Sequence, residues 1–234
     1  MPSSNPSTLD VSTSLEAVGS IVKASESDRP SVLEDIFEDC HNIAIWHRNL
    51  SSQLKFEVKS LLASGELPLI TLPLTPENCR TEMSAALHCF ENTCMLVQDI
   101  SQLVELFCGL FDQKQVKLRL TALDRVMCSR FHVDRVACRL VTTYHGCNTH
   151  WLPETGIDRT KLGRGNKGLP DELSGIYRSS GDIKHLTNGD VALLKGSLWR
   201  GNEHLGLVHR SPTPKPGESR LLMTLDFVSW ASNG

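Results

Sequence analysis

The chain has 234 residues, of which 40% are hydrophobic and 22% charged, as expected of one globular domain, with or without an appendage. Its net charge of −3 provides no basic surface, so we do not expect nucleic-acid binding as its main function. No apolar run has membrane-spanning length, and no basic residue or apolar core precedes Lys23 as in a secretory signal. We therefore expect a cytoplasmic protein that does not act at a membrane.

The eight cysteines are expected to be thiols, most of them buried as small apolar side chains. No C-x-x-C pair occurs, which removes the strongest sequence sign of a structural zinc site. Cys138, His145, Cys147 and His150 are a second group of soft ligands, for which core thiols and loop imidazoles are the interpretation that we favour.

Residues 1–29 are rich in polar residues and poor in large apolar ones, which is typical of a disordered tail. Residues 30–234 are expected to form one domain. Ser31 and Glu34 have the spacing of a capping box, which predicts a short helix that ends near Asp39.

The first part of this domain, residues 30–113, is predicted to be mainly helical. The elements expected after the first helix are a buried strand at 43–46, helices at 51–63, 76–88 and 93–111, and an edge strand at 67–74 that Pro68 and Pro73 interrupt.

The second part, residues 114–230, is predicted to be β-structure. Apolar and charged residues alternate at 116–120, which predicts a strand. It is the first of a series of short strands separated by Gly, Asn and Pro turns. The further strands are expected near 130–135, 138–145, 149–152, 183–187, 190–195, 205–210 and 220–228. We expect an α+β fold in which the helical part packs on a jelly roll of the cupin or double-stranded β-helix type.

The long glycine-rich stretch 156–175 lies between two of these strands. Loops of such length in a compact domain are usually functional or disordered, and we expect this one to act as a lid over a site.

One motif carries most of the functional argument. His132 and Asp134 form an H-x-D step, and residues two apart on a strand point to the same face. With His209 from a distant strand they would make a two-His-one-carboxylate triad, which suits Fe(II) and oxygen chemistry. Chance alone supplies about one His-x-acid step in a chain with 9 His and 27 acidic residues, so the context has to support it.

With Arg220 eleven residues after His209, the pattern resembles that of the Fe(II)/2-oxoglutarate-dependent dioxygenases. These are double-stranded β-helix enzymes with an H-x-D step, a distal His and a basic residue shortly after it. The resemblance implies that His132, Asp134 and His209 hold Fe(II), and that Arg220 pairs with the far carboxylate of 2-oxoglutarate.

Residues 35–228 also resemble a bacterial family known as domain of unknown function 1826, which implies no activity. The segments that carry this resemblance are 43–48, 99–100, 131–134, 139–144, 149–153, 191–196 and 209–212.

Further residues are candidates for the same site. Arg139 could replace Arg220 as the cosubstrate anchor, and Tyr144 could offer the cosubstrate a hydroxyl. Cys128, four residues before His132, is a candidate extra ligand that would favour zinc. The residues proposed for the pocket wall are Arg210, Lys195, Trp151 and Trp199.

Three hypotheses follow from the sequence. The first is an Fe(II)/2-oxoglutarate-dependent dioxygenase that hydroxylates a small molecule or a protein. The second is a cupin-like zinc-binding protein or metal-dependent hydrolase, which would use the same ligands without oxygenase activity. The third is a metal-free binding module. The substrate and the oligomeric state stay open.

Overall fold

The computed structural model of the chain describes residues 22–65, 68–123, 129–212, 214 and 217–228. They form a main sheet of seven strands in the order β1-β2-β8-β5-β10-β4-β3, and a small sheet of three in the order β7-β6-β9. The main sheet consists of β1 (Lys23–Ser27), β2 (His41–Trp46), β3 (Leu69–Leu74), β4 (Val116–Leu123), β5 (Cys138–His145), β8 (Val191–Lys195) and β10 (Arg220–Phe227). The small sheet consists of β6 (His150–Trp151), β7 (Lys184–His185) and β9 (His209–Arg210). The α+β class is confirmed.

The first strand lies within the segment that we expected to be a tail. Strand β1 pairs in parallel with β2, with Ala24 opposite Ile43. The described structure therefore starts at Val22 rather than at residue 30, and residues 1–21 lie outside it. Short polar strands such as Lys23–Ser27 escape a composition argument because an edge strand buries little apolar surface.

The predicted capping box at Ser31 does not form. The segment Pro30–Phe37 is a 3₁₀ helix whose N-cap is Arg29, and no side chain caps it. It buries Val32, Leu33 and Ile36, so packing on the sheet rather than capping holds this helix.

The helices of the first half follow the prediction closely. Helix α1 (Ser52–Ala63) begins after Ser51, whose hydroxyl accepts a hydrogen bond from Leu54 N at 3.1 Å. Helix α3 (Cys94–Leu110) covers nearly the whole expected range. Helix α2 (Cys79–Ala86) starts later than expected, because Thr75 and Asn78 exchange side-chain-to-backbone hydrogen bonds and fix a turn before it.

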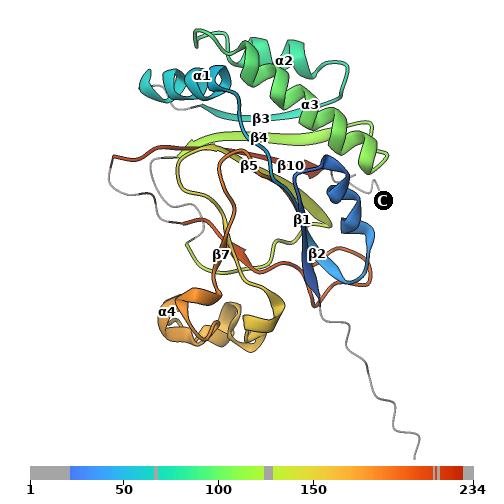
Figure 1. The fold of residues 1–234 in the computed structure, drawn as a ribbon, viewed down its shortest axis with the longest axis vertical. Coiled ribbons are helices and arrows are strands. Elements are labelled where there is room, and N and C mark those ends of the chain that lie inside the picture. The colour runs from blue at the N-terminus through green and yellow to red at the C-terminus, as the bar shows by residue number, and fades with distance from the viewer. Residues whose placement is uncertain (1–21, 66–67, 124–128, 213, 215–216, 229–234) are drawn as a thin grey trace, which may run out of the picture.

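Helices α1, α2 and α3 cover one face of the main sheet (Figure 1). Successive side chains of β10 point to opposite faces of the sheet. Leu221, Met223 and Leu225 share the face that packs against these helices, and they are completely buried. We call this the helical face of the main sheet.

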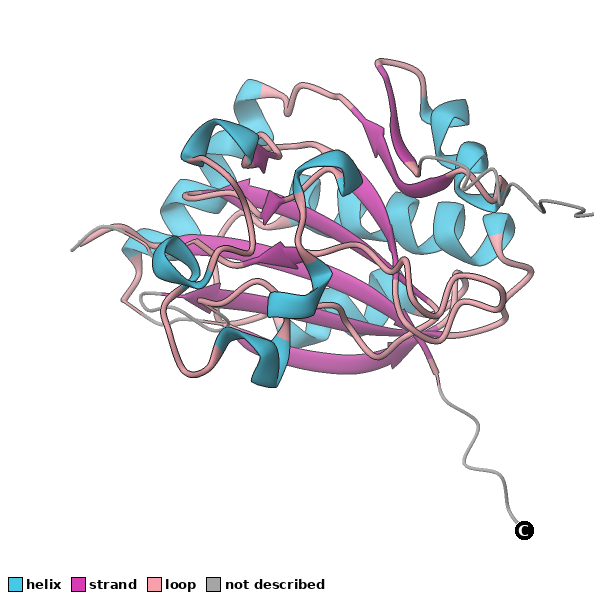
Figure 2. Ribbon diagram, turned by 90° about the horizontal axis from the view of Figure 1, so that it is seen from below, coloured by secondary structure: helices cyan, strands magenta, loops and turns pink. Residues whose placement is uncertain are grey.

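The opposite face of the main sheet looks toward the small sheet, and we call it the pocket face. Figure 2 shows short helices and loops gathered on this side. They include α4 (Asp171–Ser174) and the 3₁₀ helices Glu154–Gly156, Arg159–Lys161, Gly163–Asn166 and Ser180–Asp182. The expected loop 156–175 is thus a chain of tight turns, and its role as a lid stays a prediction.

No helix in the described ranges is both long and apolar enough to cross a lipid bilayer.

Candidate metal centre

The backbone brings the two halves of the predicted triad together. The expected strand near 130–135 is reduced to one antiparallel bridge between His132 and His209. Each residue donates its N–H to the other's carbonyl oxygen at 3.0 Å. The two imidazoles therefore project side by side, with ring centroids 4.7 Å apart.

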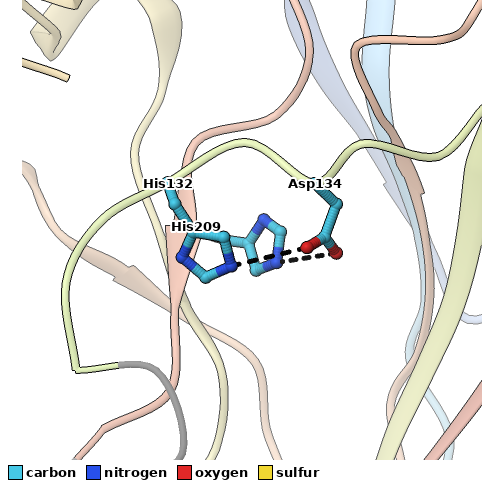
Figure 3. Close-up of side chains that lie close together, drawn as sticks. All are labelled: His132, Asp134 and His209. Carbon is cyan, nitrogen blue, oxygen red and sulfur yellow. Dashed lines mark ion pairs between the residues drawn. The ribbon is translucent and has the colours of Figure 1, made fainter. Parts of the chain in front are cut away.

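Asp134 completes the cluster (Figure 3). Its Oδ1 lies 3.4 Å from His132 Nε2, and its Oδ2 lies 3.3 Å from His209 Nε2. One potential ligand atom from each side chain lies within 4.8 Å of the other two. The described residues contain no other group of three or more His, Cys, Asp or Glu placed in this way. The structure thus brings the three sequence-predicted ligands together.

Both imidazoles are oriented by their second nitrogen. His132 Nδ1 lies 2.9 Å from the carbonyl oxygen of Arg130, and His209 Nδ1 lies 3.2 Å from that of Leu207. Because a carbonyl oxygen only accepts, each Nδ1 carries the proton and each Nε2 keeps its lone pair in the neutral ring. This is the tautomer that a metal-binding histidine needs.

The three side chains require a positive charge between them. Lone pairs on Nε2 repel the Asp134 carboxylate unless a proton or a cation lies between them. The hydrogen bond to Asp134 accordingly raises the pKa of His132, although burial opposes this shift. Burial raises the pKa of Asp134, but hydrogen bonds from both imidazoles and the charges of His209 and Arg139 outweigh it, so this pKa falls below its usual range.

Arg139 holds Asp134 from the other side. Its Nη1 donates to Asp134 Oδ2, while Nε and Nη2 donate to Asp226 Oδ1 and Oδ2 at 2.7 and 3.0 Å. Arg139 and Asp226 are opposite each other on β5 and β10. Since two carboxylates already occupy its guanidinium, Arg139 orients the candidate ligand Asp134 and is not a free cosubstrate anchor.

Arg220 is different, because its guanidinium is buried without a carboxylate. It is 1% exposed and donates to the hydroxyl groups of Ser211, Thr143 and Thr149 at 3.0–3.1 Å. Its Nε has no hydrogen-bond partner among the described residues, and none of them forms an ion pair with it. Burial lowers the pKa of Arg220 to about 10. A buried cation without a counter-ion is costly, so this position suits an anionic ligand.

A cavity of about 120 Å³ lies on the pocket face beside the triad. His132, Asp134 and His209 line it, as do Thr149 and Ser211, two of the hydroxyl partners of Arg220. Arg210 also lines the cavity, as expected, and its guanidinium stacks 4.4 Å over the ring of Phe131.

Tyr144 lies on the wrong face of the sheet for its predicted role. Its hydroxyl donates to Asp99 Oδ2 at 2.8 Å within the helical core. Tyr144 is an odd number of residues after Arg139 on the same strand, so the two side chains point in opposite directions.

The three remaining pocket candidates do not line this cavity. Lys195 points to the helical face, where its Nζ donates to Glu38 O at 2.8 Å and lies 4.8 Å from the Trp199 ring. Trp199 packs there against the ring of Phe111. Trp151 is buried in an apolar cluster on the pocket face, and its contribution there is packing. Cys128 lies outside the described residues.

Several residues that line the cavity were not predicted from the sequence, and Arg119, Thr121 and Thr224 are among them. The alternation of apolar and polar residues at 116–120 predicted the strand, but it does not show whether the polar side faces solvent or a cavity. In β4, an interior strand between β10 and β3, the polar side faces the cavity at Arg119 and Thr121.

Comparison with solved structures supports the fold. The chain is similar to a rice dioxygenase for auxin oxidation, with a TM-score of 0.50, 10% identity, and coverage of 89% of this chain and 83% of that one. It is equally similar to the Arabidopsis thaliana dioxygenase for auxin oxidation 1, described as a binary complex with 2-oxoglutarate, with a TM-score of 0.50 and 8% identity. That match covers 89% of this chain and 93% of the plant protein. At such low identity these matches show a shared fold of the oxygenase type. A search of curated proteins by sequence found no match.

The family profile described as "Protein of unknown function (DUF1826)" matches residues 27–226. The chain therefore belongs to the DUF1826 family, as its sequence resemblance implied.

Proposed function

We propose that this DUF1826 protein is an Fe(II)- and 2-oxoglutarate-dependent dioxygenase that hydroxylates a substrate bound in the cavity. One observation carries the proposal. A His-Asp-His cluster lines the same cavity as Thr149 and Ser211, which hold a buried arginine that has no carboxylate partner among the described residues.

The donor set fits the metal. Two neutral imidazole nitrogens and one carboxylate form a facial triad, which leaves coordination positions open on Fe(II). Asp134 Oδ2 is held by Arg139, so Oδ1 is the oxygen that is freer to bind. When bound, Fe(II) would activate O₂ and couple decarboxylation of 2-oxoglutarate, to succinate and CO₂, to substrate hydroxylation.

The chain's own residues would hold the cosubstrate. Arg220 would pair with the far carboxylate of 2-oxoglutarate through its guanidinium fork. The hydroxyl groups of Ser211, Thr143 and Thr149 keep that guanidinium in place without neutralising it. The 2-oxoglutarate complex of the Arabidopsis neighbour supports this choice of cosubstrate.

The same triad could hold zinc, so the first test is of metal affinity and cosubstrate affinity together. Fe(II) affinity would be measured anaerobically by competition with a coloured chelator, and 2-oxoglutarate affinity by calorimetry on the metal-loaded chain. We expect His132→Ala to abolish stoichiometric Fe(II) binding. We expect Arg220→Gln to keep it and to weaken 2-oxoglutarate binding at least tenfold.

His145→Ala is the matched control, because His145 lies on β5 outside the triad. It should leave both affinities unchanged. Stoichiometric zinc with no affinity for 2-oxoglutarate would replace this proposal with the zinc-protein hypothesis. Fe(II) binding that survives His132→Ala would contradict it outright.

A further inference from the structure

We propose that Arg119, Thr121 and Thr224 form an anion-binding subsite in the cavity, and that the substrate is a small organic carboxylic acid with an apolar body. The assignment of this acid as a substrate rests on the proposed function. The binding subsite itself does not.

Arg119 is a cation that has no partner within the described ranges. It lies in the middle of β4, is half-buried, and lines the same cavity as the triad. No described residue forms a hydrogen bond or an ion pair with it, whereas Arg139 and Arg210 are both paired with carboxylates. A guanidinium directed into a cavity without a counter-ion is suited to an incoming anion.

Two buried hydroxyl groups flank Arg119. Thr224 is directly opposite Arg119 in the β10–β4 register, and Thr121 is the next residue of β4 on the same face. Thr121 is 5% exposed and Thr224 is 7% exposed, and both line the cavity. Neither Oγ1 atom has a hydrogen-bond partner in the described part of the chain. Each hydroxyl group can donate a hydrogen bond to a carboxylate oxygen of a ligand. This bond would remove the free-energy cost of a buried hydroxyl group without a partner.

The charges around the cavity leave Arg119 available for the substrate. Asp134 is engaged by both imidazoles and by Arg139. In the proposed enzyme, Arg220 pairs with the far carboxylate of 2-oxoglutarate, and the metal takes its other end. Among the described residues that line the cavity, one unmatched positive charge then remains, and it belongs to Arg119.

The apolar side chains that line the cavity indicate the chemistry of the rest of the ligand. Val141, Leu194 and Leu222 contribute apolar surface to the cavity. A ligand with a carboxylate at the Arg119 end and a hydrocarbon or aromatic body would satisfy both kinds of wall. The cavity is small, about 120 Å³, so the acid that we propose is a small one.

The test uses three probe acids, phenylacetate, benzoate and hexanoate, each paired with its neutral amide. Their affinities for the full chain would be measured by calorimetry, once with Fe(II) and 2-oxoglutarate under anaerobic conditions and once without either. We expect at least one acid to bind at least tenfold more tightly than its amide. Arg119→Gln should remove that preference, Arg119→Lys should retain most of it, and Thr224→Val should weaken acid binding severalfold.

Lys117→Gln is the matched control, since it removes the same charge from an exposed position two residues earlier on the same strand. It should change nothing. Arg119→Gln should also leave the affinity for 2-oxoglutarate unchanged, and a thermal melt of each variant would show that it is folded.

The inference is overturned if no acid binds better than its amide, or if folded Arg119→Gln binds the acids as the wild type does. It is also overturned if Arg119→Gln weakens 2-oxoglutarate as much as Arg220→Gln does, because Arg119 would then anchor the cosubstrate. Arg119-dependent acid binding in a chain that takes up neither Fe(II) nor 2-oxoglutarate would uphold the subsite and refute the proposed dioxygenase.

Discussion

Arg139 donates a hydrogen bond to the same carboxylate oxygen of Asp134 that lies 3.3 Å from His209 Nε2. The guanidinium thereby fixes the rotation of the only acidic ligand in the triad. Its own position is fixed by the bidentate pair with Asp226 on the neighbouring strand. Metal affinity should therefore depend on Asp226, which contacts none of the three ligands in the described structure.

Asp226→Asn should lower Fe(II) affinity by about 10- to 100-fold, because partners that orient metal ligands typically contribute that much. Anaerobic chelator competition would measure it. Asp99→Asn is the control, since Asp99 forms a comparable pair with Arg48 on the helical face. That variant should lose stability but keep its Fe(II) affinity, and equal losses of affinity in the two variants would argue against an orienting role for Arg139.

Tyr144→Phe tests the assignment of Tyr144 to the helical core. The substitution removes a hydrogen bond to Asp99, which Arg48 still holds at 2.6 Å. We expect a loss of about 1 kcal/mol in the free energy of unfolding, measured with urea. The 2-oxoglutarate affinity should stay the same. A cosubstrate affinity reduced tenfold or more would show that the hydroxyl reaches the site after all.

Gly146→Ala should damage the cosubstrate site through the backbone. Gly146 has φ +92°, and a Cβ there would lie 2.5 Å from Ser219 O and 2.8 Å from Arg220 Cα. The start of β10 must move to accept it, and Arg220 moves with that strand. We expect destabilisation of about 1–3 kcal/mol and weaker binding of 2-oxoglutarate. Gly201→Ala has a similar φ of +84° but nothing within 4 Å of the added carbon, so it should cost stability alone.

His150 should make the protein less stable in acid. Burial, followed by the charges of His185, Arg210 and Arg220, lowers its pKa to about 4 from the ordinary 6.5. Between these two pH values the unfolded chain binds a proton that the folded chain does not, so stability falls as the pH drops through this window. Above pH 6.5 the effect is absent.

His150→Gln should therefore show a shallower loss of stability than the wild type between pH 6.5 and pH 4. Urea unfolding at a series of pH values would measure the difference between the two proteins. A difference that is the same at every pH would mean that His150 does not titrate in this way.

The sequence predicted the elements whose signals are local. Helix α3 followed from the spacing of its apolar residues, and Gly65 marked the end of α1. The His132–Asp134 step alone is expected by chance in this chain. The triad could therefore be predicted only when the step was considered together with the distant His209. A single backbone bridge joins these two segments, and no strand periodicity could have shown it.

Most errors in the predicted site concerned the face of the sheet to which a side chain points. Tyr144 and Lys195 were assigned to the pocket from their neighbourhood in sequence, although strand periodicity places each of them with residues of the helical face. Arg119 was overlooked for the converse reason, since a polar residue between leucines looks like a solvated one until the second sheet is known. Sequence alone does not say which face of a strand becomes a cavity.

The anaerobic visible spectrum tests the central claim most directly. Fe(II) and then 2-oxoglutarate would be added to the wild type, to His209→Ala and to Arg220→Ala. We predict a weak metal-to-ligand absorption that appears only when both are present in the wild type and is lost in both variants. A blank wild-type spectrum from a protein that holds stoichiometric zinc, or that holds no metal at all, would contradict it.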